Sequence, residues 1–220
     1  MIVEVWSDVV CPWCYIGKRR FEQAIERLAD DPDFDDTIEI VYRPYQLDPT
    51  APPGTTTPVV DAYARKFGGR ERAEAIIASI TTTAAEEGLD FHLYWAKRAN
   101  TRDAHRVLQY ALDHGPDGAQ GALKERLLQA YFTDGLDVGD PDVLADAAAA
   151  VGLDRAAVVE HLGSDAGMTE LAESLAFAAE AEITAVPTYV IGGRWAIPGA
   201  QDPDVFVQVL RSLAATERAG

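Results

Sequence analysis

Sequence typical of β-strands occurs near the two ends of this chain, and this distribution limits the folds open to it. At the first end, the apolar and β-branched residues 2–6 are typical of a buried strand. Residues 14–28 follow with apolar side chains at spacings of three and four, the period of an amphipathic helix. A second strand-like run at 38–43 completes a strand–helix–strand opening, which predicts a βαβ unit with a right-handed crossover.

The far end of the chain carries a complementary pattern. Residues 188–191 and 194–197 are strand-like, and the Gly-Gly pair between them favours a two-residue hairpin turn. An Asp-Pro pair at 202–203 then begins a final helix. From 58 to about 182 almost every periodic signal is helical. The sequence therefore predicts an α/β protein in which a β-α-β unit and a β-β-α unit are separated by a large all-helical insertion.

Composition is typical of an acidic globular protein. Of the 220 residues, 48% are hydrophobic and 25% charged, which supplies apolar surface for a core and argues against disorder. The formal net charge of −17 repels a nucleic-acid backbone, so we expect no nucleic-acid partner. The N-terminal residues do not resemble a signal peptide, and no apolar run is long enough to span a bilayer. We therefore expect a soluble, cytoplasmic protein with no membrane partner, in which a structural disulfide is improbable.

Both cysteines of the chain, Cys11 and Cys14, lie in the stretch SDVVCPWCYIGKRR at residues 7–20. Two thiols at this spacing can form a redox pair or half of a metal site, or the spacing can be incidental. A structural zinc site needs four ligands, and the chain has no second cysteine pair. The four histidines show no metal-ligand spacing: His92, His105, His114 and His161. We therefore predict no metal site and favour the redox pair over the other two interpretations.

The position of the two cysteines at the start of a predicted helix suggests different roles for them. If Cys14 lies in the first turn, Cys11 lies just before the helix and faces unpaired backbone N–H groups at the positive end of the helix dipole. That environment favours a thiolate, which is the nucleophile in disulfide exchange. Cys14 can then attack the mixed disulfide and release the product. Pro12 suits the first turn because its missing N–H would be unpaired there anyway.

Several stretches resemble a known family. DVVCPWCYIG and AVPTYVIGG are similar to the DsbA-like thiol:disulfide oxidoreductases, which have a thioredoxin-like fold with a helical insertion. The chain resembles the FrnE-type subgroup more closely, in SDVVCPWCYIGKRRFE, YRPYQLDP, NTRDAHR and AVPTYVIGGRWAIPGAQ. The resemblance implies a thioredoxin-like domain at 1–55 and 168–220 and a helical insertion domain at 56–167. It also implies a thiol:disulfide oxidoreductase or isomerase that needs no resident cofactor beyond a redox-active disulfide.

The resemblance assigns roles to individual residues. Cys11 would be the nucleophile, Cys14 the resolving cysteine and Pro187 a cis-proline. Pro187 also stands directly before a strand-like run, where a trans proline starting the strand is the alternative interpretation. Substrate would contact Pro12, Trp13 and the backbone of Val186. DsbA has a histidine between its cysteines, whereas Pro12 and Trp13 offer no such charge, so we expect this protein to be less oxidising.

Two further groups of polar residues are candidates for the site. Thr101 and His105 stand four residues apart on a predicted helix and can point the same way, and Asn100 adjoins them. This patch could line the cleft beside the dithiol, or His105 could be a half-buried histidine with local hydrogen bonds. Asp8 stands three residues before Cys11 and is either a proton relay to Cys14 or a cap of the loop.

Two other functions remain open at this point. Glutathione-dependent isomerases and kappa-class transferases resemble the same architecture, but they typically have a serine where Cys11 stands and no second cysteine. A non-enzymatic holdase or scaffold would leave Cys11 unreactive. For an oxidoreductase we expect thiol- or disulfide-containing proteins or small molecules as partners, with glutathione as a candidate co-substrate. The sequence does not specify an oligomeric state.

Overall fold

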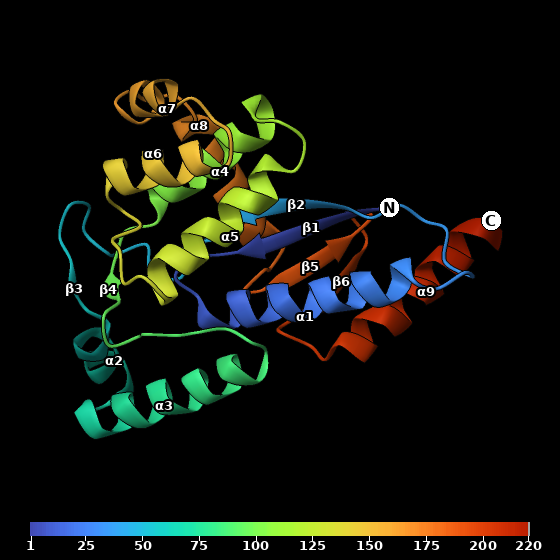
Figure 1. Cartoon of the computed structure of the whole chain (residues 1–220), viewed down its shortest axis with the longest axis horizontal. Coiled ribbons are helices and arrows are strands. Elements are labelled where there is room, and N and C mark those ends of the chain that lie inside the picture. The colour runs from blue at the N-terminus through green and yellow to red at the C-terminus, as the bar shows by residue number, and fades with distance from the viewer. Residues whose placement is uncertain (220) are drawn as a thin grey trace.

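The structure is a computed structural model that describes residues 1–219 and the side chains of residues 1–216. It contains a four-stranded sheet formed by both ends of the chain. The strand order is β2-β1-β5-β6. β1 runs parallel to β2 and antiparallel to β5, and β5 and β6 form the expected hairpin (Figure 1). The strands are β1 (Ile2–Ser7), β2 (Glu39–Pro44), β5 (Thr188–Ile191) and β6 (Trp195–Pro198). This order confirms the prediction of a β-α-β unit completed by a β-β-α unit.

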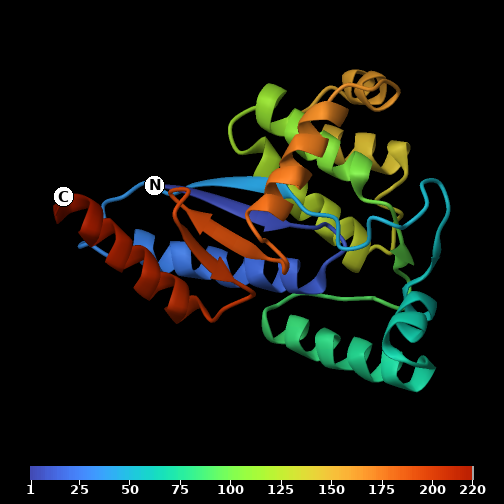
Figure 2. The ribbon, with the colours of Figure 1, turned by 180° about the vertical axis from the view of Figure 1, so that it is seen from behind.

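Alternate residues of β1 pack on opposite faces of the sheet, as the pleat of a strand requires. Val3 and Val5 join the core formed with α1 (Pro12–Ala29) and α9 (Pro203–Ala219), which contact each other. Trp6 points to the other face, where its ring stacks on Phe177 of α8 (Met168–Glu180) at 5.7 Å. Figure 2 shows α8 on the near side of the sheet and α1 on the far side.

The remaining helices lie between the two halves of the sheet in sequence. They are α2 (Val59–Phe67), α3 (Arg70–Glu86), α4 (Arg102–His114), α5 (Ala119–Phe132), α6 (Pro141–Ala150) and α7 (Arg155–Leu162). Their apolar faces form a second core, and Val9, Tyr15 and Ile16 from the start of α1 belong to it. The helical region therefore packs directly on the segment that carries the two cysteines.

The helical region also contains a short ladder that the sequence analysis did not predict. β3 (Thr57–Pro58) pairs antiparallel with β4 (Lys97–Arg98) and closes the loop around α2 and α3. Two residues are too few to show an alternating pattern, so this pairing has no signal in the sequence. None of the described helices is long and apolar enough to cross a membrane.

Candidate active site

The cysteine motif forms the junction between β1 and α1. Cys11 is the N-cap of α1 in an extended conformation, Pro12 occupies the first helical position, and Cys14 lies in the first turn. The Cys14 amide donates to the Cys11 carbonyl oxygen at 3.0 Å. No side chain caps this end of α1, so the N-terminal backbone N–H groups remain oriented toward the region of the Cys11 side chain.

The two thiols are free and are both withdrawn from solvent. Cys11 is 3% exposed and Cys14 2%, whereas the indole of Trp13 between them is 43% exposed. Cys11 lies just outside the helix, as the sequence predicts, but the structure also buries its side chain. Burial raises the pKa of the Cys14 thiol well above its usual range, and hydrogen bonding to Cys11 and the charge of Cys11 raise it further. Cys14 is therefore the group that keeps its proton.

A loop far along the chain lies against the first thiol. The Val186–Pro187 peptide bond is cis, and the Cys11 Sγ–H donates to the Val186 carbonyl oxygen at 3.7 Å. α1 approaches this loop closely at Gly17, where an added Cβ would lie 2.9 Å from the Pro187 Cγ and 2.8 Å from the Tyr189 Oη. Glycine is required there for close approach. The structure thus brings together Cys11, Val186 and Pro187, three of the predicted site residues.

Asp8 lies beneath the cysteine loop and is fully buried. Its carboxylate accepts hydrogen bonds from the amides of Val9 at 2.8 Å and Leu47 at 2.7 Å. The His105 Nε2 lies 3.1 Å from the Asp8 Oδ1 and 3.0 Å from the Tyr45 carbonyl oxygen, so this nitrogen carries a proton shared between two acceptors. Asp8 therefore links three parts of the chain: the end of β1, the segment that follows β2, and helix α4.

The charge of Asp8 is stabilised in this position. Burial alone would raise the pKa of the Asp8 carboxyl, but its hydrogen bond and charge interaction with His105 and the Leu47 amide outweigh burial and lower it. Among the described residues, no hydrogen bond joins the Asp8 carboxylate to either thiol. The contacts favour the loop-capping role of the two considered for Asp8.

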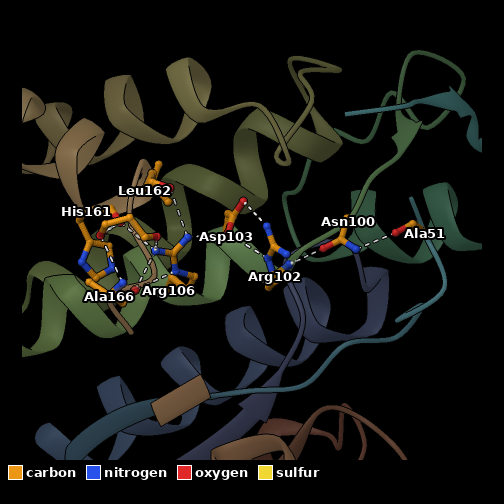
Figure 3. Close-up of polar contacts among 9 residues, drawn as sticks. Ala51, Asn100, Arg102, Asp103, Arg106, His161, Leu162 and Ala166 are labelled. Atoms are coloured by element: carbon orange, nitrogen blue, oxygen red, sulfur yellow. Dashed lines mark hydrogen bonds and ion pairs between the residues drawn. The ribbon is translucent and has the colours of Figure 1, made fainter. Parts of the chain in front are cut away.

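The three residues of the predicted polar patch, Asn100, Thr101 and His105, make contacts with different parts of the structure. His105 reaches Asp8. The Asn100 Nδ2 instead donates to the Ala51 carbonyl oxygen at 2.6 Å (Figure 3). Thr101 is buried at the start of α4, and its carbonyl oxygen accepts the amide of His105. The structure therefore connects only His105 of this group to the cysteine loop.

Arg106, which follows His105, has a structural role that the sequence analysis did not identify. Its guanidinium is 2% exposed and donates to the carbonyl oxygens of His161 at 2.8 Å, Ser164 at 2.6 Å and Ala166 at 2.7 Å. It also bonds Asp103 one turn back, and Figure 3 shows these contacts together. Arg106 thus holds the connection between α7 and α8 rather than contacting the thiols.

Lys124 on α5 is the functional candidate that sequence reasoning missed. It is 1% exposed, and its Nζ has no hydrogen-bond partner among the described residues and lies 5.7 Å from the centre of the Tyr42 ring. Burial lowers the pKa of Lys124, and the charges of Cys14, Asp8 and Cys11 oppose that shift. A signal did exist: Lys124 shares one helical stripe with three buried residues, Leu127, Leu128 and Tyr131.

The described residues contain no group of three or more histidine, cysteine, aspartate or glutamate side chains placed to hold a metal ion. The arrangement offers one thiol at a helix N-terminus, a second thiol with a raised pKa one turn away, and a backbone carbonyl beside the first. These are the parts that thiol–disulfide exchange uses.

Comparison with known proteins agrees with this chemistry. Residues 2–211 match the family model described as a DSBA-like thioredoxin domain. The protein YwbO of Bacillus subtilis is 30% identical over 94% of both chains. A probable DsbA oxidoreductase from Streptomyces coelicolor is 34% identical, with a TM-score of 0.87 over 99% of this chain and 91% of that one.

A more distant structure shares the fold. The cytosolic disulfide reductase DsbM of Pseudomonas aeruginosa, in a structure with GSH, is 16% identical with a TM-score of 0.65, over 97% of this chain and 98% of that one. The architecture is therefore the thioredoxin-like fold with a large helical insertion that the sequence analysis expected. The family match over nearly the whole chain and the two relatives at or above 30% identity lead to one conclusion: this protein belongs to the DsbA-like family of oxidoreductases.

Proposed function

We propose that the protein catalyses thiol–disulfide exchange through the Cys11-Pro12-Trp13-Cys14 motif. The observation that carries this proposal is the asymmetry of the dithiol: Cys11 caps α1, and Cys14 is buried one turn inside with a raised pKa. A helix N-terminus stabilises the first sulfur as a thiolate, while burial keeps the second protonated until it is needed.

The exchange proceeds in two balanced steps. The Cys11 thiolate attacks one sulfur of a substrate disulfide, the substrate S–S bond breaks, and one half leaves as a thiolate that takes a proton from solvent. Cys14 then loses its proton and attacks the Cys11 sulfur, which releases the second half as a thiol. The protein dithiol is oxidised to a disulfide by two electrons, and the substrate is reduced by the same two. The reverse sequence oxidises a substrate dithiol.

The surroundings suggest where substrate binds. The Val186 carbonyl oxygen, now an acceptor for Cys11, is free to accept a substrate backbone N–H once Cys11 is bonded to substrate. The exposed Trp13 indole and the Pro12 ring flank the approach to the sulfur. Because neither side chain is charged, we expect a potential less oxidising than that of DsbA, in keeping with the proposed cytoplasmic location.

The co-substrate is also part of the proposal. DsbM is named as a cytosolic disulfide reductase and was solved with GSH, which supports glutathione as a candidate co-substrate here. A glutathione-dependent isomerase of the kappa-class type would need only one activating group at position 11. Retention of two thiols in the geometry of an exchange pair favours the oxidoreductase. A non-enzymatic holdase would not require either thiol to react.

The reduction potential of the Cys11–Cys14 pair tests this proposal directly. We expect equilibration with glutathione redox buffers to give a value of roughly −270 to −120 mV, between those of thioredoxin and DsbA. The oxidised fraction would be read by mass spectrometry after alkylation of free thiols. Failure to form the intramolecular disulfide at any buffer ratio would refute the exchange function and favour the holdase.

A further inference from the structure

A cavity lies beside the cysteine loop. Its volume is about 450 Å³, and Val10, the residue before Cys11, lines one wall. The walls are largely apolar or aromatic and include Val59, Tyr63 and Tyr131. This size suits a small organic ligand or part of one.

The same cavity has a cationic rim, formed by Arg65 and Lys66 on α2 and by Arg98 on β4. Arg98 is already neutralised by Asp48, with its Nε 2.5 Å from the carboxylate oxygen. Arg65 and Lys66 form no ion pair with any residue that the structure describes, and both are exposed. The Lys66 Nζ lies 5.6 Å from the centre of the Phe67 ring, which leaves its charge without an acidic partner. The chain has 36 acidic and 19 basic side chains, so its surface as a whole repels anions. Two adjacent cations without an acidic partner beside the cavity would attract an anionic ligand locally.

Two observations link this cavity to the cysteine loop beyond the presence of Val10 in its wall. Tyr63, which lines it, is partly buried, and burial together with the charge of Cys11 raises the pKa of Tyr63 to about 12. Leu47, another lining residue, donates its amide to Asp8 under the cysteine loop. Leu47 therefore belongs both to the wall of the cavity and to the contacts that hold the cysteine loop.

We propose that this cavity binds one half of an acidic, low-molecular-weight disulfide whose body is apolar or aromatic and whose carboxylate faces Arg65 and Lys66. The inference rests on the proposed exchange function and adds the class of substrate. The bound half is the one that becomes bonded to Cys11; the other half leaves as a thiolate and is protonated by solvent. Cys14 then displaces the bound half as a thiol, and the dithiol supplies both electrons.

Two chromophoric disulfides of opposite character test the proposal. Reduced protein is mixed with 5,5′-dithiobis(2-nitrobenzoate), an aromatic dianion, or with 4,4′-dithiodipyridine, a neutral aromatic disulfide, and the released thiol is followed by stopped flow. In the variant Arg65→Gln with Lys66→Gln, we expect the anionic-to-neutral rate ratio to fall roughly five- to thirty-fold, which corresponds to about 1–2 kcal/mol.

The chain offers a matched control. Arg72 on α3 is also exposed and forms no ion pair among the described residues, but it does not line the cavity. Arg72→Gln should leave the rate ratio unchanged. Charge reversal, Arg65→Glu with Lys66→Glu, should raise the rate with cystamine, a dicationic disulfide, as measured by loss of protein thiol in quenched samples.

The outcomes separate the inference from the function on which it rests. An unchanged rate ratio in the Arg65 and Lys66 variant, or an equal fall in Arg72→Gln, would overturn the substrate class while leaving exchange intact. If wild-type protein fails to react even with the neutral disulfide, the exchange function itself is wrong and the inference falls with it. Thermal unfolding of each variant confirms that the exposed substitutions leave the fold unaltered.

Discussion

Cys11 and Cys14 are three residues apart and almost equally buried, yet their environments differ. Cys11 ends an extended segment and faces the N-terminus of α1 and the Val186 carbonyl, whereas Cys14 lies inside the helix with a raised pKa. The proposed order of attack therefore rests on backbone geometry rather than on solvent exposure, because exposure hardly distinguishes the two sulfurs.

This asymmetry predicts which single-cysteine variant accumulates mixed disulfides. In Cys14→Ser the Cys11 thiolate still attacks but nothing resolves the product, so mixed disulfides should persist. In Cys11→Ser the remaining buried thiol should trap few. Incubation with a model disulfide and intact-mass spectrometry would measure both. Equal trapping by the two variants would contradict the proposed order of attack.

We expect Lys124 to lower the stability of the fold and, at the same time, to support the reactivity of the dithiol. Its ammonium is buried without a hydrogen-bond partner among the described residues, which costs folding free energy. Lys124→Met should therefore raise the free energy of unfolding by ~1–3 kcal/mol. Removing a positive charge that stabilises thiolates should also make the Cys11–Cys14 potential more negative.

The control for Lys124 is Lys18, which is also buried but is paired with Glu22 and Glu125. Lys18→Met should destabilise the fold. Because the pKa of Lys124 is lowered in the folded state, the unfolded state binds more protons between that value and ~10.4, and wild-type stability rises with pH there. The advantage of Lys124→Met should be greatest at low pH and shrink on the alkaline side; a constant difference would argue against this account.

At the scale of elements, the site is held by contacts between helices and the loops that they meet. α4 reaches the cysteine loop through His105 and Asp8, and α1 meets the cis-proline loop at Gly17. Each contact joins segments that are far apart in sequence. Changes at these positions should therefore alter the relative placement of the dithiol and its surroundings.

His105→Ala should destabilise the protein by ~1–3 kcal/mol at neutral pH, because it removes a partner from a buried carboxylate. The pKa of Asp8 is lowered in the folded state, so its contribution is present above the unfolded value of ~3.9 and is lost as pH falls through the folded pKa. The difference between variant and wild type should therefore shrink in acid. Denaturant unfolding at several pH values measures this, with His114→Ala, an exposed histidine on the same helix, as the control.

Gly17→Ala should disturb the meeting of α1 with the cis-proline loop. The added Cβ would lie within 3 Å of Pro187 and Tyr189, so α1 or the loop has to move. We expect a loss of ~1–3 kcal/mol in stability and slower reaction of Cys11 with disulfides. Gly121→Ala on α5 is the matched control: its Cβ would meet only the Tyr42 ring at 3.9 Å, so it should stabilise by ~0.5–1 kcal/mol. Equal effects of the two substitutions would contradict the close-approach argument.

At the scale of the whole molecule, α1 connects the two cores. Its first turns place Tyr15 and Ile16 among the inserted helices, and its later turns place Phe21 and Leu28 on the sheet. Glu125 of α5 adds two ion pairs, to Lys18 and Arg19 of the same helix. The division at residues 55/56 and 167/168 stays a prediction, but the shared helix argues that the two parts unfold together.

Equilibrium unfolding in denaturant should therefore show one transition. Tryptophan fluorescence and far-UV circular dichroism should give coincident curves, because disrupting α1 exposes apolar surface in both cores. Two separated transitions would show that the inserted helices form an independently stable unit, and would weaken the argument that they help to position the dithiol.

The sequence by itself determined the order of elements and the local chemistry of the dithiol. Strand and helix periods, a Cys-Pro pair opening a helix and a proline before a strand depend only on neighbouring residues. These local patterns predicted the β-α-β and β-β-α units and the helical insertion, whereas the thioredoxin-like fold and the cis-proline at Pro187 came from the family resemblance. The structure then placed Cys11 beside the Val186–Pro187 loop.

Only the tertiary structure decided how the inserted helices meet that dithiol. The pairing of Asp8 with His105 spans 97 positions, and no local pattern encodes it. In the sequence Lys124 is one lysine in an apolar helical stripe, and only packing buries it where the charges of the thiols act on it. Arg65 and Lys66 became candidate binding residues only because they line a cavity. The physical reason is that burial, charge interactions and cavities are properties of three-dimensional neighbourhoods, which packing brings together from distant parts of the chain.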